Sequence, residues 1–473
     1  MSPADAGAQR ARPTHRPAPD EISPDPDELG HRIPEPVLAV LRRLGAAGFE
    51  AYAVGGSLRD LILGRPVADW DIATSALPEE TQTVFPGSVY ENRFGTVGVK
   101  RDRAIDQITT YRREHDYADH RRPGRVEFGT DLEEDLARRD FTINAIAWGM
   151  RDGAPELRDP FGGLADLRGG VIRAVGRAEE RFAEDALRML RALRFAATLG
   201  FEIDRATLDA IRSNARLASE LSGERVGAEL RRILGALRPS IALRLAAETG
   251  LLDVLFPELA IQRGIAQNKV PGADLWDHTM ASVDAADPGR PNVRLAALLH
   301  DVGKPATLRD GHFPDHEREG ARVADEMLRR LAFPRAEADD VVHLIGQHMF
   351  TYAPSWSDAA VRRFIRRVGV EAVDDLLALR ESDNVGSGLP ADAGRLPELR
   401  RRIAGELDAG HALDLASLAI DGDDIRTALD LPEGPEIGRL LHRLLEHVVA
   451  DPTVNERERL LAMARRIHAA ASP

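Results

Sequence analysis

Hydrophobic and polar positions follow strand-like patterns near the start of the chain and helix-like patterns over most of the rest. Residues 37–49 carry apolar side chains three and four positions apart, which predicts a short amphipathic helix. The mostly apolar residues 51–54 predict a short strand directly after it. Residues 92–100 and 104–112 alternate apolar and polar side chains on either side of a polar turn, as the strands of an antiparallel hairpin do.

Helical spacing dominates the later part of the chain, whereas the first residues show no period. Residues 1–32 are rich in Pro, Ala, Asp and Arg, which predicts a disordered tail. The pattern as a whole predicts strands and helices near the start of the chain and helices over most of the rest.

Composition restricts the class of protein. The chain has 473 residues, of which 43% are hydrophobic and 30% charged, typical of a globular protein with several domains. No apolar run approaches the roughly 18 residues needed to span a bilayer, and no apolar signal core is present, so a cytoplasmic enzyme is expected. With no Cys, any metal must bind Asp, Glu or His. The net charge of -14 argues against non-specific nucleic-acid binding, although local patches among the abundant Arg residues leave RNA open.

The residues after the first predicted strand form the first candidate site. Gly55 and Gly56 predict a tight turn, and Ser57 is positioned to cap the helix expected over 58–63. Backbone N–H groups at such a helix start can hold phosphate groups, and Arg59 lies in its first turn.

Asp69 and Asp71 follow where a second strand is expected to begin. Side chains two apart on a strand point to one face, so these carboxylates would stand side by side. Two close carboxylates are costly unless a cation lies between them. Mg²⁺ takes oxygen ligands and leaves positions for phosphate oxygens, so the pair predicts a metal–triphosphate site. Asp106, on the second hairpin strand, is either a third carboxylate of this site or a surface residue.

A second motif, RRDFTINA, occupies residues 138–145. Arg139 and Asp140 precede an apolar segment that is expected to form a helix. Asp140 is then either an ordinary helix cap or part of a binding site, together with Asn144.

A third motif, E-D-x-x-R, occupies residues 184–188 within a stretch of helical spacing. Asp185 and Arg188 would share a helix face, which Arg191 continues. The pair is either an exposed salt bridge or a reader of bases. A carboxylate beside a guanidinium complements the pairing edges of cytosine and adenine and clashes with those of uracil and guanine.

Together these motifs resemble the nucleotidyltransferases that extend RNA 3′ ends, namely the bacterial-type CCA-adding enzymes and poly(A) polymerases. The resemblance implies an α+β fold, with a small mixed α/β nucleotidyltransferase head (33–165) followed by an all-helical remainder, namely a neck (166–250), a second domain (251–395) and a tail (396–473). It implies that the Gly-Gly turn binds triphosphate, that D-x-D binds catalytic metals, and that E-D-x-x-R templates the incoming base. It also implies that residues 111–125, predicted to be a mobile basic loop, help to switch nucleotide choice. The implied nucleotide contacts are Gly55, Gly56, Arg59, Arg139, Asp140, Asn144, Asp185, Arg188 and Arg191, and the implied catalytic metal ligands are Asp69 and Asp71.

Residues 222–226, SGERV, resemble the next motif of the same family. Glu224 and Arg225 are therefore either nucleotide-binding residues or capping and packing residues.

Histidines then gather between positions 278 and 348, around the adjacent pair His300-Asp301. Neutral imidazoles and carboxylates suit a divalent metal. The pattern resembles the HD phosphohydrolase domain, which makes 251–395 the corresponding segment. The implied metal ligands are His278, His300, Asp301 and Asp383, with His316 and His343 as further candidates.

The sequence thus predicts an enzyme that adds CCA to tRNA 3′ ends from CTP and ATP, with Mg²⁺ in the head and a divalent metal at the HD site. No membrane partner is expected. The alternatives are a poly(A) polymerase, an HD phosphohydrolase whose head only binds nucleotide, and a non-catalytic RNA-binding protein. The acidic composition argues against the first, because such polymerases often carry a basic tail.

Overall fold

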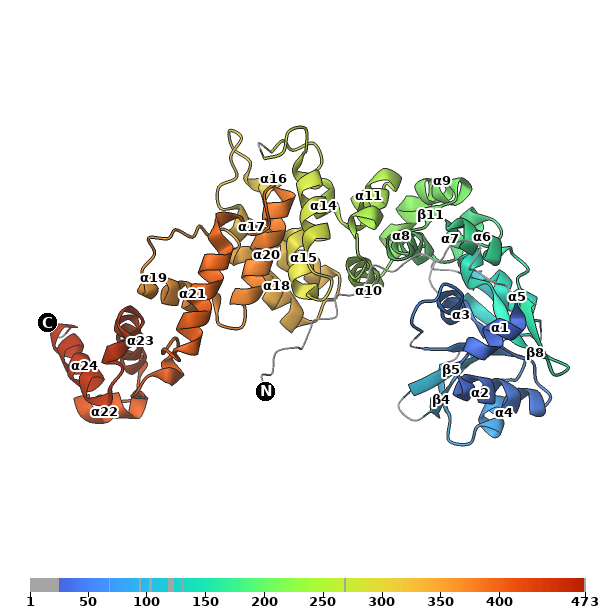
Figure 1. The fold of residues 1–473 in the computed structure, drawn as a ribbon, viewed down its shortest axis with the longest axis horizontal. Helices are drawn as coiled ribbons and strands as arrows, with labels where there is room; N and C mark the ends of the chain where they lie inside the picture. The colour runs from blue at the N-terminus through green and yellow to red at the C-terminus, as the bar shows by residue number, and fades with distance from the viewer. Residues whose placement is uncertain are drawn as a thin grey trace, which may run out of the picture. The chain divides into compact units, whose positions relative to one another are not determined.

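The computed structural model describes residues 25–67, 69–92, 95–101, 104–117, 123–129, 131–267 and 269–471. Their contacts form two compact units. The first runs to Ile233 and includes Ile241–Pro257, and the second comprises Leu234–Ser240 and the residues from Glu258 onward. The first unit holds a mixed sheet with helices and the second is helical in the described residues, so the predicted α+β class is confirmed (Figure 1).

A seven-stranded sheet lies at the centre of the head. Its strand order is β3-β4-β5-β2-β1-β8-β9, with β2 and β5 parallel and the other neighbours antiparallel. The predicted strand at 51–54 and the predicted hairpin of β4 and β5 are confirmed, although the turn at 102–103 lies outside the described residues. The strands are β1 (Ala51–Val54), β2 (Asp71–Thr74), β3 (Val89–Asn92), β4 (Thr96–Arg101), β5 (Ala104–Thr110), β8 (Ala147–Arg151) and β9 (Ala154–Arg158).

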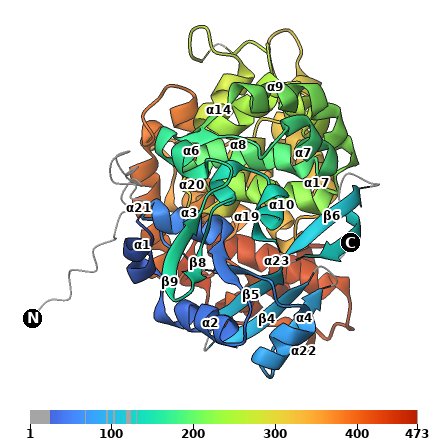
Figure 2. The ribbon, with the colours of Figure 1, turned by 90° about the vertical axis from the view of Figure 1, so that its right-hand side faces the viewer.

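Amphipathic helices cover the strands of the head. Helix α2 (Glu35–Ala46) buries Val37, Leu41 and Leu44 and packs on β1 and β8, as its spacing predicts. Helix α4 (Pro78–Val84) packs on β3, β4 and β5, beside α2 (Figure 2). Helix α3 (Gly55–Ile62) packs against β1 and β2 and begins the first candidate site.

Two segments of the first unit differ from their predictions. Residues 26–32 form helix α1 (Pro26–Arg32) rather than part of a disordered tail, because the Asp25 carboxylate caps the N–H groups of Asp27 and Glu28. Within 111–125, predicted to be a basic loop, β6 (Arg112–Tyr117) and β7 (Pro123–Phe128) pair as an antiparallel hairpin. The residues joining these strands lie outside the described ranges.

Short helices follow the head within the first unit. The head is followed by α6 (Gly163–Gly169) and β10 (Val171–Ile172), which pairs with β11 (Glu202–Ile203). The remaining elements of this unit are α7 (Ala178–Glu184), α8 (Leu187–Leu199), α9 (Arg205–Asn214), α10 (Gly223–Leu234), α11 (Ser240–Thr249) and α12 (Leu251–Leu255). Helix α13 (Pro257–Ala260) lies where the second unit begins.

The second unit consists of helices in its described part. Its last three helices bury a separate apolar cluster that includes Ile425, Leu444 and Leu460. The helices are α14 (Leu275–Ala285), α15 (Pro291–Leu299), α16 (Lys304–Thr307), α17 (His316–Arg330), α18 (Arg335–Gln347), α19 (Asp358–Val368), α20 (Val373–Gly386), α21 (Leu396–Asp408), α22 (Gly422–Leu429), α23 (Pro435–Ala450) and α24 (Arg457–Ala471).

Candidate active site and metal centre

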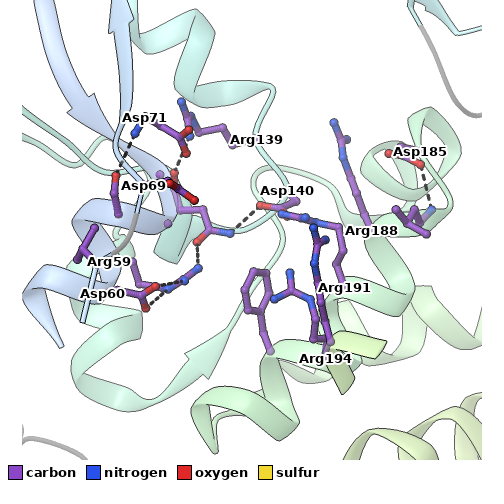
Figure 3. Close-up of a pocket in the computed structure, with 18 of the residues that line it drawn as sticks. Arg59, Asp60, Asp69, Asp71, Arg139, Asp140, Asp185, Arg188, Arg191 and Arg194 are labelled. Carbon is purple, nitrogen blue, oxygen red and sulfur yellow. Dashed lines mark hydrogen bonds and ion pairs between the residues drawn. The ribbon is translucent and has the colours of Figure 1, made fainter. Parts of the chain in front are cut away.

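A cavity of about 770 Å³ in the first unit gathers most of the residues predicted to bind nucleotide. Figure 3 shows most of the residues that line it, with arginines and carboxylates from β2, α3, α8 and the segment after α5 (Leu132–Ala137). All eleven residues assigned to the head site are among its lining: Gly55, Gly56, Arg59, Asp69, Asp71, Arg139, Asp140, Asn144, Asp185, Arg188 and Arg191.

The turn between β1 and α3 leaves no room for a side chain. Gly55 has a φ of 77°, and a Cβ there would lie 2.7 Å from Nη1 of Arg139 and 3.3 Å from Oδ2 of Asp71. Ser57 is not the predicted helix cap, because α3 begins before it. Its hydroxyl instead donates to the carbonyl of Val54 at 2.9 Å and accepts from the N–H of Asp71 at 3.4 Å.

The two aspartates of D-x-D differ in their setting. Strand β2 begins at Asp71, whereas Asp69 precedes it, so the prediction that both lie on one strand is wrong. Burial raises the pKa of Asp71, Arg139 opposes this, and the charge of Asp69 raises it further. The carboxylates are therefore close enough to repel, and a divalent cation would relieve that repulsion. Oxygen donors beside an arginine-lined cavity fit Mg²⁺ and the phosphate oxygens of a nucleotide.

Asp106 does not join this pair. It is buried on β5, where Gln107 is the residue paired with Asp71 across the parallel ladder. Because side chains alternate along a strand, Asp106 faces the other side of the sheet. It is also not a surface residue, so neither sequence interpretation of Asp106 agrees with its place.

A chain of hydrogen bonds links four of the predicted residues across the cavity. Nη1 of Arg59 donates to Oδ1 of Asn144 at 2.6 Å, and Nδ2 of Asn144 donates to Oδ1 of Asp140 at 2.9 Å. The other oxygen of Asp140 accepts from Nε of Arg191 at 2.8 Å. Burial alone would raise the pKa of Asp140, but the Arg191 charge and the hydrogen bond from Asn144 lower it to about 2.

The segment after Asp140 is not the predicted apolar helix. It forms a short 3-10 turn, Thr142–Asn144, before β8. That turn brings Asn144 back onto Asp140, so Asp140 binds side chains in addition to the N–H of Phe141.

Asp185 and Arg188 do not share a helix face as predicted. Asp185 has φ −145° and ψ 104° and separates α7 from α8. Its carboxylate accepts from the N–H of Leu187 at 3.0 Å and pairs with Nη2 of Arg225 at 2.7 Å. Arg188 pairs instead with Glu184 at 2.5 Å. Both predicted base-reading groups thus line the cavity, each with a different partner.

Of the two residues left open in SGERV, Arg225 lines the cavity, whereas Glu224 is exposed and is not among the lining residues. The motif analysis missed Glu229, which is buried on α10 and accepts from Nε of Arg194 at 2.7 Å. It also missed Phe195, whose ring lies under the guanidiniums of Arg194 at 4.1 Å and Arg59 at 4.9 Å. The spacing of Arg188, Arg191 and Phe195 on one helix was the available signal.

A cluster of imidazoles and carboxylates, here called the HD cluster, lies in the second unit. Nε2 of His278 is 3.1 Å from Nε2 of His300, 3.2 Å from Oδ2 of Asp301 and 3.3 Å from Oδ1 of Asp383. Nε2 of His300 is 3.2 Å from Oδ2 of Asp301. The structure therefore brings the four predicted ligands together from α14, the end of α15, and α20.

The other carboxylate oxygen of Asp301 faces two more histidines. Oδ1 of Asp301 lies 3.5 Å from Nε2 of His316 and 3.8 Å from Nε2 of His348. The His316 nitrogen is buried and has no hydrogen-bond partner among the described residues, as a metal-binding atom would. His348, not assigned from the sequence, takes the place predicted for His343, because Nε2 of His343 bonds to the carbonyl of Val368.

The surroundings of the HD cluster keep its carboxylates in the charged form that binds metals. Burial alone would raise the pKa of Asp301, but His300 and Lys304 hold it well below its ordinary value. Burial would lower the pKa of His300, yet Asp301 and Asp383 raise it to about 9. Two carboxylates surrounded by imidazole nitrogens are a suitable donor set for a divalent metal.

Three family models match successive parts of the chain: "Poly A polymerase head domain" at residues 51–173, "Probable RNA and SrmB- binding site of polymerase A" at 200–262, and "HD domain" at 283–384. The nucleotide cavity draws on the first match, and most of the HD cluster lies in the third. No helix among the described residues is long and apolar enough to cross a membrane.

Whole-chain comparisons agree with these matches. The chain is 36% identical over 432 residues to a CCA-adding enzyme of Geobacillus thermodenitrificans, covering 90% of this chain and 95% of that relative. It is 33% identical over 435 residues to a CCA-adding enzyme of Streptococcus mutans, with 91% and 96% covered. The crystal structure of Bacillus stearothermophilus CCA-adding enzyme in complex with CTP superposes with a TM-score of 0.71 at 31% identity, covering 93% of this chain and 99% of that one. This chain belongs to the CCA-adding enzyme family.

Proposed function

We propose that the head cavity adds cytidine and adenosine nucleotides to the 3′ end of tRNA, using CTP and ATP, to build the CCA end. The observation that carries this proposal is the chain Arg59–Asn144–Asp140–Arg191 in the same cavity as Asp69 and Asp71. Arginines that can bind a triphosphate and a carboxylate pair that can bind a metal thus line the same cavity. A solved relative is a complex with CTP, and another of lower identity is a complex with ATP.

Each group of residues has a distinct part in the reaction. The backbone at Gly55 and Gly56 and the side chains of Arg59 and Arg139 hold the triphosphate. Asp69 and Asp71 would hold Mg²⁺, which supplies charge neutralisation and activates the RNA 3′-hydroxyl. That oxygen attacks the α-phosphorus, the bond to the β-phosphate breaks, and pyrophosphate leaves while the hydroxyl proton passes to solvent. Positioning and electrostatic stabilisation account for most of the acceleration.

Base selection falls to Asp185 and Arg188. A bound cytosine or adenine presents an amino donor beside a ring-nitrogen acceptor, which match a carboxylate and a guanidinium respectively. Nucleotide binding would exchange part of the Asp185–Arg225 and Arg188–Glu184 contacts for contacts to the base. Uracil and guanine offer the reverse pattern and would leave both charged groups unsatisfied.

The decisive assay separates CCA addition from poly(A) synthesis. Transfer RNA that ends at the discriminator base is incubated with each triphosphate alone and with CTP and ATP together, and the products are read on a gel. We expect CTP alone to add two nucleotides and CTP with ATP to add three. Long tails from ATP alone would identify a poly(A) polymerase, and no addition at all would leave the head as a nucleotide binder. A cytoplasmic location is proposed to match this substrate.

A second activity is favoured by the HD cluster. Four buried side chains lie within hydrogen-bonding distance of one another: His278, His300, Asp301 and Asp383. Buried charges are costly, so such a cluster indicates a function beyond stabilising the fold. We propose that residues 251–395 form a phosphohydrolase domain in which these residues would hold a divalent metal that activates water. The test is release of phosphate from a nucleotide phosphate ester by the full chain, with metal and after removal of metal by a chelator. Equal rates in both conditions would contradict a metal-dependent hydrolase.

A further inference from the structure

Lysine is scarce in this chain, and its placement is uneven. Of the 63 Lys and Arg residues only three are lysines: Lys100, Lys269 and Lys304. Two of these three lie at the HD cluster. Because arginine serves nearly every other cationic position, the two retained lysines point to a need for a compact ammonium group there.

Lys304 forms an ion pair with Asp301, one of the proposed metal ligands. Its side chain is buried, and Nζ lies 2.6 Å from Oδ2 of Asp301 and over the ring of Phe313. Lys304 therefore holds Asp301 in place, and it has little freedom to move toward a ligand.

Lys269 lies in a looser setting. Its Nζ is 3.4 Å from Oδ1 of Asp383, a long contact, and about a third of its side chain is exposed. Gln267, two residues earlier, places Oε1 3.4 Å from Nζ of Lys304. Nε2 of Gln267 is buried and has no hydrogen-bond partner among the described residues. A partly exposed cation with one long contact and an unused amide donor thus lie at the edge of the HD cluster.

Charge balance indicates what these donors would bind. The two lysines already offset the charges of Asp301 and Asp383, and imidazoles that bind a metal are neutral. Each divalent cation bound to the cluster therefore adds positive charge that the protein does not neutralise. A phosphate monoester carries about two negative charges near pH 7, whereas a diester carries one. A dianion matches the added charge better than a monoanion does.

We propose that Lys269 and Gln267 bind the phosphate group of the substrate at the HD cluster, and that this substrate is a dianionic phosphate monoester. The inference rests on the phosphohydrolase function proposed above. In the reaction a water oxygen bonds to phosphorus, the ester P–O bond breaks, and the alcohol leaves with a proton, so that inorganic phosphate and a hydroxyl are formed. Lys269 orients the phosphate by a charge-assisted hydrogen bond.

The test measures binding and turnover separately, on the full chain loaded with Mn²⁺. Binding of inorganic phosphate is followed by titration calorimetry, and the heat that the His300→Ala/Asp301→Ala double variant lacks is assigned to the HD cluster. Lys269→Met should weaken this component by about tenfold, since one charge-assisted hydrogen bond is lost. The Mn²⁺ content, measured by mass spectrometry, should stay the same. Lys100→Met, in the head, is the matched control and should leave phosphate binding unchanged.

Turnover of p-nitrophenyl phosphate and of its diester bis-p-nitrophenyl phosphate tests the charge preference. The wild type should favour the monoester, and Lys269→Met should raise its KM by about tenfold with little change for the diester. Unchanged phosphate binding in Lys269→Met would overturn the role of Lys269, and equal kcat/KM for both esters would overturn the preference for a dianion. If neither ester is cleaved while phosphate binding still depends on Lys269, the hydrolase function fails and the phosphate site stands.

Discussion

Asp140 is the residue at which the contacts of the nucleotide cavity meet. Its two carboxylate oxygens connect Asn144, and through it Arg59, with Arg191. A buried carboxylate bound in this way holds two arginines at fixed positions before any triphosphate arrives, which reduces the ordering needed on binding.

The pKa of Asp140 gives this arrangement a pH signature. Its folded pKa of about 2 lies below its ordinary value of 3.8, so its contribution to stability is present above about pH 4 and is lost as pH falls toward 2. Asp140→Asn keeps the size of the side chain and removes the charge. We expect the variant to be less stable than wild type by roughly 2–3 kcal/mol at pH 6, with the difference shrinking near pH 2. Urea unfolding of both proteins at several pH values measures it, and a difference that is independent of pH would contradict the assignment.

The second prediction for single residues concerns the carboxylate pair of Asp69 and Asp71. Asp71→Asn should reduce nucleotide addition by at least about a thousandfold, because a neutral amide binds Mg²⁺ poorly and the cation neutralises charge in the transition state. Circular dichroism should show an unchanged fold. Asp106→Asn is the control: Asp106 faces the other side of the sheet, so a folded variant should keep most of its activity. Near-normal addition by Asp71→Asn would remove Asp71 from the site.

At the scale of elements, the break between α7 and α8 separates what the sequence predicts from what it cannot. Residues 184–194 have continuous helical spacing without Gly or Pro, so a single helix is the natural prediction. The break at Asp185 is stabilised by Arg225, forty positions away in α10, and pairing across such a distance leaves no local signal. The same holds for Asn144, which a 3-10 turn folds back onto Asp140.

The elements that were predicted correctly share a local cause. Helix α2 and the β4–β5 hairpin show the period of their element in the sequence, and β1 appears as a short apolar run that is buried throughout. The predicted residues of the nucleotide cavity, with Arg225 among the candidates, were found by motif resemblance, whereas Glu229 and Phe195 belong to the tertiary packing and were missed. His348 was overlooked because spacing alone does not separate it from His343.

The break between α7 and α8 at Asp185 also affects the prediction for base choice. Asp185→Ala removes the acceptor for the exocyclic amine, so preference for CTP over UTP should fall roughly ten- to a hundredfold. Arg225→Met should have a smaller effect in the same direction, because it frees Asp185 from its fixed position. Glu224→Ala, exposed and outside the cavity lining, is the matched control. The measurement is incorporation of all four triphosphates on one tRNA, and unchanged ratios for Asp185→Ala and Arg225→Met would leave Asp185 as a salt-bridge residue only.

At the scale of the whole molecule, the chain carries two candidate centres in two separate compact units. The nucleotide cavity uses carboxylate oxygens and arginines, which suit Mg²⁺ and triphosphate. The HD cluster uses imidazoles and carboxylates, which suit a borderline transition metal as well. No residue is shared between the two sets, so each centre can be removed without touching the ligands of the other.

The last prediction tests that independence with His300→Ala/Asp301→Ala. Both residues are buried, and Lys304 would lose its partner, so the double variant should bind less divalent metal and lose phosphohydrolase activity. Its nucleotide addition should stay within about twofold of wild type, because the first unit has its own core and its own ligands. Since removing a buried partner is destabilising by about 3–5 kcal/mol, His300→Gln/Asp301→Asn, which keeps the volume, is the companion variant. Metal content, hydrolysis and nucleotide addition are measured on both. Loss of nucleotide addition in the folded companion variant would show that the HD cluster takes part in, or supports, the reaction of the head.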